Sequence, residues 1–264
     1  MTKHTQCVIT RRPSVRLHEG ALTYVERRPL DFDLALAQHA AYRAAAAAAG
    51  GALIDVPAAD EFPDSTFVED VLLAFPECFV LCRPGAASRA GEPALMAPWL
   101  PSDRPTFAIP SPATIDGGDV LQIGKDVFVG LSKRTNADGL DALGHILAQF
   151  GYAVRPVAVR GALHLKTAIT APADQFVLAN PDWVDLEPFI ARRVIAVHPD
   201  EPFAANTLRI GEDLFMQSSH ARTADRLRAV GLTVTALDIS EFAKLEAGLT
   251  CMSVVTPRAS AKGS

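Results

Sequence analysis

The stretch DVLQIGKDVFVGLS (Asp119–Ser132) contains two short apolar runs, VLQI and VFVGL, that have the length and composition of β-strands. A predicted helix follows directly, from about Thr135 to Phe150. Three further strand-like runs, YAVRPVAV, LHLKTAIT and QFVLAN, come after that helix. One helix followed by two or three short strands is therefore the unit from which we predict the fold.

This unit occurs five times along the chain. The first helix is expected from Asp31 to Ala49, because Asp31 or Asp33 can cap it, alanine-rich sequence fills it and a Gly-Gly pair ends it. The helices recur at a spacing of roughly 40 to 55 residues, which is typical of structural repeats. The remaining helices are expected near Ala87, at Trp183–Ala191 and at about Ala221–Val230.

The order of the elements limits the fold class. Alternating helices and strands would ordinarily indicate a doubly wound parallel sheet, but here each helix is followed by too many strands for simple βαβ alternation. Neither GxGxxG nor GxxxxGK[ST] occurs, so no nucleotide-binding fingerprint is present. We predict an α/β fold in which repeated units are arranged radially, as a single domain over residues 1–256, followed by a small, polar, disordered tail over residues 257–264.

The composition, 49% hydrophobic and 21% charged, is typical of a soluble globular protein. A net charge of −5 provides no basic surface for nucleic acid and suits a cationic small substrate. No apolar stretch approaches the about 18 residues of a membrane span, and none resembles a signal peptide, so we expect a cytoplasmic protein with no membrane partner. The excess of Arg over Lys and the alanine-rich helices are typical of a GC-rich bacterial genome.

The four cysteines form no CxxC pair, and we expect them to be reduced. Cys78 and Cys82 lie in the apolar run CFVLC, where a strand would place them on one face. Buried structural thiols are favoured there over metal ligands, and no metal site is predicted.

Two acidic segments are candidates for binding a cation. FPDSTFVED (Phe62–Asp70) contains Asp64, Glu69 and Asp70; if it ends in a strand, Glu69 and Asp70 point to opposite faces and one of them can line a cavity. The alternative is a solvated turn. DGGD (116–119) has paired glycines that allow close backbone approach, with flanking acids that can meet a cation, although by itself it is also typical of a plain turn.

Two residues are candidates for the chemistry itself. His164 lies in LHLKT, where a strand would put His164 and Lys166 on one face; the alternative is a structural histidine. Cys251 lies in GLTCMSVV, where Gly248 forms a turn into a strand; the alternative is a buried, inert thiol. Each signal is weak when it is taken alone.

Together, these residues provide what is needed to bind and hydrolyse the guanidinium group of an amino acid. A guanidinium is planar, permanently charged and a pure hydrogen-bond donor, so carboxylates must bind it. Arg89 and Arg134, in polar loops, can bind the α-carboxylate of an amino-acid substrate. Hydrolysis at the guanidinium carbon requires a soft nucleophile, and a thiolate is the best that side chains provide.

The segments FPDSTFVED, DGGDV, SKRTNADG, LHLKT and LTCMS closely resemble the dimethylarginine dimethylaminohydrolase family of the guanidine-modifying enzyme (pentein) superfamily. The resemblance covers about residues 4 to 256, in the family's order and spacing. It implies a fivefold pseudosymmetric α/β propeller with the active site in a central channel. It also implies hydrolysis of methylated arginines to citrulline, without a metal or cofactor.

The resemblance implies a role for each candidate residue. Cys251 would be the nucleophile, His164 the general acid/base, and Asp116 would orient either His164 or the guanidinium. Backbone carbonyls of Leu22 and Leu245 would receive the α-ammonium group. The full substrate site would comprise Leu22, Asp64, Glu69, Asp70, Arg89, Arg134 and Leu245.

The chain departs from the family pattern at two positions, which leaves the fine specificity open: Asp116 stands where some members have Glu, and Ala90 where a second Arg is common. A deiminase-like hydrolase of arginine or hydroxyarginine is one alternative, and a non-catalytic binder of arginine derivatives is another. Arg89 and Arg134 argue against agmatine, which lacks the carboxylate. The oligomeric state also stays open, with a homodimer as one option.

The segment Arg16–Arg28, RLHEGALTYVERR, is polar at both ends and lies between a predicted strand and the first helix. An ordinary surface loop and a lid are equally compatible with its composition. Because Leu22 matches a family position that contacts substrate, we expect a lid that is mobile without ligand and ordered when ligand is bound.

Overall fold

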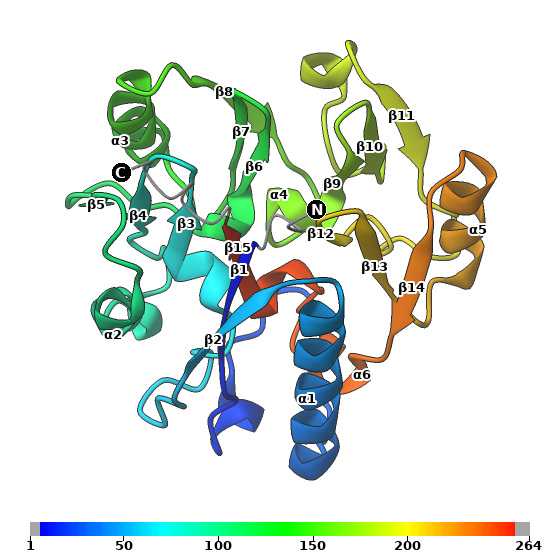
Figure 1. The fold of residues 1–264 in the computed structure, drawn as a ribbon, viewed down its shortest axis with the longest axis horizontal. Coiled ribbons are helices and arrows are strands. Elements are labelled where there is room, and N and C mark those ends of the chain that lie inside the picture. Colours follow the sequence, from blue (N-terminus) through cyan, green and yellow to red (C-terminus); the bar gives the residue numbers. More distant parts are fainter. Residues whose placement is uncertain (1–5, 257–264) are drawn as a thin grey trace, which may run out of the picture.

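The computed structural model describes residues 6–256, which form five three-stranded sheets arranged around a common centre (Figure 1). Every sheet repeats one pattern: its middle strand pairs antiparallel with one neighbour and parallel with the other. The fold is the fivefold pseudosymmetric α/β propeller predicted from the sequence. The disordered tail predicted for residues 257–264 lies outside the described residues.

The first sheet joins the two ends of the described chain. It consists of β1 (Cys7–Arg11), β2 (Ala52–Val56) and β15 (Ser253–Thr256). β15 pairs antiparallel with β1, with Thr256 opposite Cys7, and the blue and red strands lie together near the centre in Figure 1. This pairing closes the ring of sheets.

The other four sheets follow in chain order. The second contains β3 (Leu72–Ala74), β4 (Phe79–Leu81) and β5 (Thr106–Ala108), and the third β6 (Val120–Ile123), β7 (Asp126–Leu131) and β8 (Ala153–Ala158). The fourth contains β9 (Ile169–Ala173), β10 (Phe176–Ala179) and β11 (Arg193–Ala196), and the fifth β12 (Leu208–Ile210), β13 (Asp213–Gln217) and β14 (Val234–Leu237).

Three long helices agree with the sequence prediction. α1 (Phe32–Ala48) begins at Asp31, whose carboxylate accepts a hydrogen bond from the Leu34 N–H, as expected for an N-cap. α3 (Ala137–Ala148) is capped by Asn136 in the same way, and α5 (Ala221–Ala229) lies within its predicted range. The helix expected near Ala87 is divided between a 3₁₀ turn, Ala87–Arg89, and the short α2 (Glu92–Met96).

The helix predicted at Trp183–Ala191 is wrong, because only a 3₁₀ turn, Glu187–Phe189, forms there. The side chains of this segment bond to its own backbone instead. Asn180 accepts from the Asp182 N–H and Asp185 accepts from the Glu187 N–H. Such local bonds compete with helical hydrogen bonding and stabilise turns.

The core is divided among the five interfaces between neighbouring sheets, because each sheet buries side chains on both faces. In β7, for example, Val127 and Val129 pack towards the second sheet, whereas Phe128 packs towards the fourth. In β1, Val8 faces the fifth sheet and Ile9 faces the second. Successive side chains of a strand point to opposite faces of the sheet, so each sheet packs against both of its neighbours.

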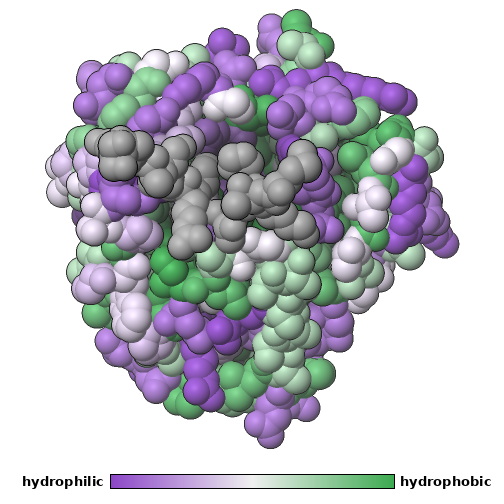
Figure 2. Space-filling view, in the orientation of Figure 1, coloured by the Kyte–Doolittle hydropathy of each residue, from purple (hydrophilic) through white to green (hydrophobic). Residues whose placement is uncertain are grey.

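The outer surface carries the polar residues and the exposed side of α1. In Figure 2 this helix appears as a pale green strip beside purple, hydrophilic surface, in keeping with its alanine-rich sequence. Among residues 6–256, no helix is both long and apolar enough to cross a membrane.

A short segment precedes the inner edge strand of each sheet. Four of these segments are helical turns: Val68–Val71 before β3, Gly117–Asp119 before β6, α4 (Leu165–Ala168) before β9, and Thr250–Met252 before β15. The segment before β12 contains Asn206 and Thr207. The inner strands surround the centre in Figure 1, so these five segments meet near the axis.

Candidate active site

One cavity brings together seven of the ten predicted site residues, and it lies where the helical turns converge. Cys251 and His164, the candidate nucleophile and acid/base, both line it. The other predicted residues in its wall are Asp64, Asp70, Arg89, Arg134 and Leu245. Residues almost 190 positions apart in the chain, Asp64 and Cys251, therefore contribute to one site.

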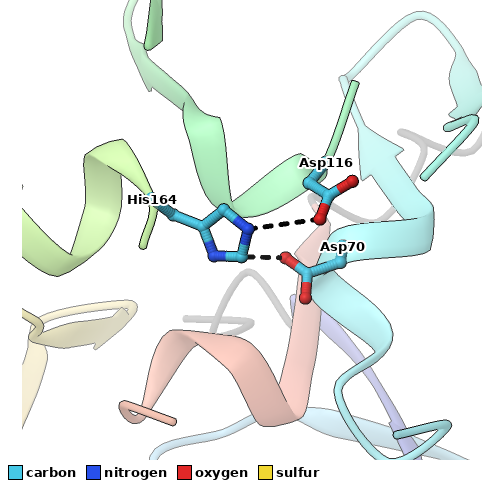
Figure 3. A group of neighbouring side chains, drawn as sticks. All are labelled: Asp70, Asp116 and His164. Carbon is cyan, nitrogen blue, oxygen red and sulfur yellow. Dashed lines mark hydrogen bonds and ion pairs between the residues drawn. The ribbon is translucent and has the colours of Figure 1, made fainter. Parts of the chain in front are cut away.

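The side chain of His164 faces two neighbouring carboxylates, those of Asp116 and Asp70 (Figure 3). Its Nε2 lies 3.2 Å from Asp116 Oδ2, and its Nδ1 lies 3.9 Å from Asp70 Oδ1. Asp116 Oδ1 accepts from the Gly85 N–H, so this fully buried carboxylate is fixed while it faces the imidazole. The geometry places Asp116 against His164, as the first of the two predicted roles, orientation of His164, would require.

These carboxylates control the charge of His164. Burial by itself lowers the pKa of the imidazole, but Asp70, Asp119 and Asp116 together raise that pKa to about 9. His164 is therefore an imidazolium at neutral pH, with both ring nitrogens acting as donors. Each of the three side chains, Asp70, Asp116 and His164, has one N or O atom that lies within 4.8 Å of the corresponding atoms of the other two, and in the free protein the proton of His164 supplies positive charge to this cluster.

Asp119 is a site residue to which the sequence assigns no role beyond its place in DGGD. It is fully buried, and its carboxylate accepts from the hydroxyls of Ser132 (2.6 Å) and Thr135 (2.7 Å) and from the Leu165 N–H (2.9 Å). Burial raises its pKa to about 6, although His164 and the donors lower it. Asp119 thus anchors the backbone beside His164 to the loop that carries Arg134.

Prediction placed His164 within a strand, and this detail is wrong. His164 has extended backbone angles but is the residue at which the short helix α4 begins. The strand β9 starts only at Ile169. The bond from the Leu165 N–H to Asp119 satisfies a donor in the first turn of α4, which the sequence pattern alone does not indicate.

Cys251 lies in the turn before β15 and is partly buried. Its Sγ accepts a weak hydrogen bond from the Gly248 N–H at 3.4 Å. Burial, followed by the negative charges of Glu69 and Asp70, raises the pKa of the Cys251 thiol. In the free protein this residue is therefore a thiol, and a cation bound in the cavity would favour its ionisation.

Cys78 and Cys82 are buried, free thiols, as predicted. Burial raises the pKa of Cys78 to about 11, and burial likewise raises that of Cys82 well above its ordinary value. Both side chains belong to the apolar cluster between the second and third sheets. Their surroundings are those of inert structural cysteines.

Arg89 is more enclosed than its expected role suggests. The guanidinium is only 4% exposed and bonds to Asp70 (2.6 Å), to both oxygens of Glu92 (2.7 and 2.9 Å) and to the carbonyl of Phe67 (2.9 Å). Burial lowers its pKa, but Glu92 and Asp70 raise the pKa well above its ordinary value. Most of its donors already have partners, so Arg89 chiefly neutralises and positions Asp70.

Arg134 is the less committed of the two arginines. Its guanidinium lies 3.9 Å from Asp116 and 3.5 Å from the Thr23 hydroxyl, and its side chain is 15% exposed. It lines the cavity beside Leu245. It is accordingly the cation better placed to receive an additional anion.

Glu69, which was predicted as part of the substrate site, does not line the cavity that contains Cys251, although its charge acts on the Cys251 thiol. The Glu69 carboxylate bonds to Lys166 Nζ at 2.6 Å and accepts from the Thr250 hydroxyl at 2.8 Å. With these two residues it lines a second cavity of about 250 Å³. Successive residues of a 3₁₀ turn point in different directions, so Asp70 faces one cavity and Glu69 the other.

The opening segment, residues 16–28, is folded against the cavity. Both oxygens of Asp64 accept from the Ala21 N–H at 3.1 Å, and Ala21 lines the cavity wall. The side chain of Leu22 instead packs against the core cluster that contains Leu17, so any contact of Leu22 with a ligand would be through its backbone.

Glu246 fastens this segment, although no sequence signal indicated it. Its carboxylate accepts from three successive backbone N–H groups, those of Thr23 (2.9 Å), Tyr24 and Val25 (2.7 Å). Glu246 has a φ of 62°, which is uncommon for a residue other than glycine and marks local strain. The residue directly after Leu245 thus bonds to the segment that carries Leu22.

No protein-family model matches this sequence. Among curated proteins, it is 40% identical to the N(G),N(G)-dimethylarginine dimethylaminohydrolase of Streptomyces coelicolor over 93% of this chain and 95% of that protein. The enzyme of the same name from Pseudomonas aeruginosa is 32% identical over 96% and 99%.

Solved structures show the same relationship. A cysteine-to-serine variant of the Pseudomonas aeruginosa enzyme, in complex with citrulline, superposes with a TM-score of 0.91 at 30% identity and covers 96% of this chain and all of that one. The N-terminal domain of a cyanobacterial arginine dihydrolase, 18% identical, has a TM-score of 0.83 over 95% of this chain and 97% of that one. At that identity the second likeness shows the fold alone.

The five-sheet ring and the cavity shared by a cysteine, a histidine and carboxylates define a hydrolase of the guanidine-modifying, or pentein, class. Within that class, the near-complete coverage of relatives at 40% and 32% identity shows that the chain belongs to the dimethylarginine dimethylaminohydrolase family.

The raised pKa of His164 predicts the pH dependence of catalysis. The reaction needs Cys251 as a thiolate and His164 as an imidazolium, so that the two side chains together hold one proton. In the free protein below pH 9, both side chains are protonated, and together they hold two. We therefore expect kcat/KM to rise with pH and to level off near pH 9, the point at which free His164 loses its proton. Initial rates over a pH series test this. A plateau already reached at pH 6 to 7 would contradict an imidazolium stabilised by carboxylates.

The contacts of Glu246 predict how the opening segment opens. Glu246→Ala removes the acceptor for three backbone N–H groups, so trypsin should cleave after Arg16 or Arg27 about tenfold faster in the absence of ligand. Saturating citrulline should slow cleavage of the wild-type protein. Glu26→Ala, at an exposed position of the same segment, is the matched control. Equal cleavage of both variants and the wild type would show that Glu246 does not hold the segment.

Proposed function

We propose that this protein hydrolyses N-omega-methylated arginines to citrulline and methylamine or dimethylamine. The observation that carries the proposal is the single cavity shared by Cys251, protonated His164, the carboxylates Asp64 and Asp70, and Arg134. The names of the relatives and the citrulline complex of one of them support the same substrate class.

Each part of the substrate has a counterpart among these residues. Asp64 and Asp70 would accept the N–H groups of the guanidinium, for which paired carboxylates have the appropriate geometry. Arg134, assisted by any remaining donor of Arg89, would bind the α-carboxylate. Backbone carbonyls of Leu22 and Leu245 would accept from the α-ammonium group.

In the first half of the reaction, the bound guanidinium favours release of the Cys251 proton to solvent, and the thiolate Sγ attacks the guanidinium carbon. The bond from that carbon to the methylated nitrogen then breaks, and the nitrogen leaves as the amine with the proton of His164. A thiouronium-type intermediate remains on Cys251. The carboxylates that raise the pKa of His164 ensure that this proton is present at neutral pH.

In the second half, neutral His164 takes a proton from water, and the resulting hydroxide attacks the carbon of the intermediate. The C–S bond breaks as the C=O bond of citrulline forms, the proton that remained on the attacking oxygen passes to the released thiolate of Cys251, and His164 keeps the proton it took from water, which restores the resting state. Asp116, at 3.2 Å from Nε2, would keep the imidazole oriented through both transfers.

We further propose that the reaction takes place in the cytoplasm, because a free thiol is required and Cys78, Cys82 and Cys251 are all free. The homodimer stays a prediction, which light scattering of the purified protein would test.

Turnover of a defined panel tests the proposed function. We expect citrulline from monomethylarginine and asymmetric dimethylarginine, with slower turnover of arginine and hydroxyarginine and little of agmatine. Cys251→Ser should fold normally and lose essentially all turnover, and His164→Ala should lose roughly 10²- to 10⁴-fold. Cys78→Ala is the control thiol variant and should keep its turnover per folded molecule. Faster turnover of arginine would favour the deiminase alternative, and binding without turnover would favour the non-catalytic one.

The different surroundings of the two arginines predict different losses. Arg134→Ala should lower kcat/KM for methylarginines roughly 10- to 150-fold, as expected for one charged hydrogen bond, with little change in stability. Arg89→Ala should also destabilise the protein by about 3–5 kcal/mol, because Asp70 and Glu92 would be left buried without their cation. Urea unfolding and steady-state kinetics separate the two effects. Equal stability of both variants would contradict the structural role of Arg89.

A further inference from the structure

The five segments that precede the inner strands are equivalent positions of the fivefold repeat. Four of them supply groups for the proposed chemistry or their immediate neighbours, among them Asp70, Asp116, His164 and Cys251. The fifth, before β12, supplies Asn206, to which neither the sequence nor the proposed reaction assigns a role.

Asn206 is 7% exposed and uses both ends of its amide. Its Nδ2 donates to the Lys166 carbonyl (3.0 Å) and to the Thr250 hydroxyl (3.0 Å), and its Oδ1 accepts from the Thr250 N–H (3.0 Å). Lys166 is two residues after His164, and Thr250 directly precedes Cys251. One side chain therefore bonds both to the segment that carries the acid/base and to the segment that carries the nucleophile.

These bonds form part of a closed ring. The Thr250 hydroxyl donates a hydrogen bond to Glu69 at 2.8 Å, Glu69 forms an ion pair with Lys166 at 2.6 Å, and the Lys166 carbonyl accepts a hydrogen bond from Asn206. Glu69 is the neighbour of Asp70. The ring thus links three segments that bear site residues, and Asn206 is the member that contacts two of them without being part of either.

Asn206 packs so closely against Gly248 that a shift of its side chain would also move Gly248. A Cβ placed on Gly248 would lie 2.3 Å from the Asn206 side chain, so only glycine fits beside it. Gly248 donates its N–H to Cys251 Sγ. Asn206 therefore limits the position of the thiol through Gly248 as well as through Thr250.

We propose that Asn206 is a positioning residue that sets the placement of the Cys251 thiol relative to the His164 imidazole. This role rests on the proposed function, in which proton transfer and nucleophilic attack occur at one carbon. Displacement of a reacting group by about 1 Å can cost 10²-fold in rate. Loss of the amide bonds should therefore reduce kcat far more than it affects substrate binding.

The experiment compares Asn206→Ala and Asn206→Asp with the same two changes at Asn180. Asn180 is a matched control because it is 5% exposed and its amide also joins two loops, donating to the Pro202 carbonyl and accepting from the Asp182 N–H. The measurements are kcat and KM for asymmetric dimethylarginine, thermal unfolding, and the rate at which iodoacetamide labels Cys251.

We expect kcat of the Asn206 variants to fall about 100-fold with KM unchanged, while labelling of Cys251 falls much less than kcat. The Asn180 variants should keep the wild-type kcat. A lower unfolding temperature with wild-type kcat, or a rise in KM alone, would overturn the positioning role. So would a loss of labelling as large as the loss of kcat, since this would place the defect in the thiol itself.

Thr250→Val provides a second route if the Asn206 variants do not fold, because it removes the hydroxyl of the ring and keeps the Thr250 N–H bond to Asn206. Its kcat should also fall with KM unchanged, and in combination with Asn206→Asp the losses should be less than multiplicative. An unchanged kcat in Thr250→Val would count against the ring. Absence of turnover in the wild-type protein would instead refute the proposed function, which keeps the two failures distinct.

Discussion

A buried carboxylate is stable in a protein only when cations or several hydrogen-bond donors face it, and this constraint organises the centre of the propeller. Four buried carboxylates meet there: Glu69, Asp70, Asp116 and Asp119. Arg89 and Lys166 supply permanent cations, and Asp119 receives three donors. Asp116 accepts from the Gly85 N–H and faces two positively charged groups, the His164 imidazolium at 3.2 Å and the Arg134 guanidinium at 3.9 Å. The buried carboxylates need positive charge beside them, and for this reason the structure stabilises His164 as an imidazolium.

The same charges set the resting state of the two reacting groups. Burial, Glu69 and Asp70 raise the pKa of the Cys251 thiol, and Asp70 also contributes to the raised pKa of His164, so the free protein holds a proton on each. The proton for the leaving amine is present before substrate arrives, whereas the thiolate is not. A guanidinium beside Asp64 and Asp70 would offset the negative potential at the sulfur and leave the imidazolium in place. Ionisation of the nucleophile would then depend on the presence of the cation that it attacks.

Much of this was predictable from sequence because it depends on local pattern. The strand-like runs, the capped helix after Asp31 and the fivefold spacing predicted a radial arrangement of α/β units, and the resemblance to a known family implied both the propeller and the residues of the cavity. What the sequence could not predict depends on which segments meet. Glu69 faces Lys166 rather than the cavity because of the direction of a 3₁₀ turn, and Glu246 holds a segment more than 200 residues away. The bonds of Asn206 likewise join segments from three repeats.

The pseudosymmetry explains how the site residues can be held at defined positions relative to one another although they come from distant parts of the chain. Each inner strand begins at a residue that its sheet fixes, such as Leu72, Ile169 or Ser253. The site residues lie two to five positions before those strands, in turns too short to move independently of the sheet. Because five apolar interfaces hold the sheets at fixed angles to one another, the same packing that stabilises the ring also sets the distances among the reacting groups. The opening segment belongs to no sheet and is attached to the rest of the protein by the hydrogen bonds of Asp64 and Glu246, so it can open without disturbing that arrangement.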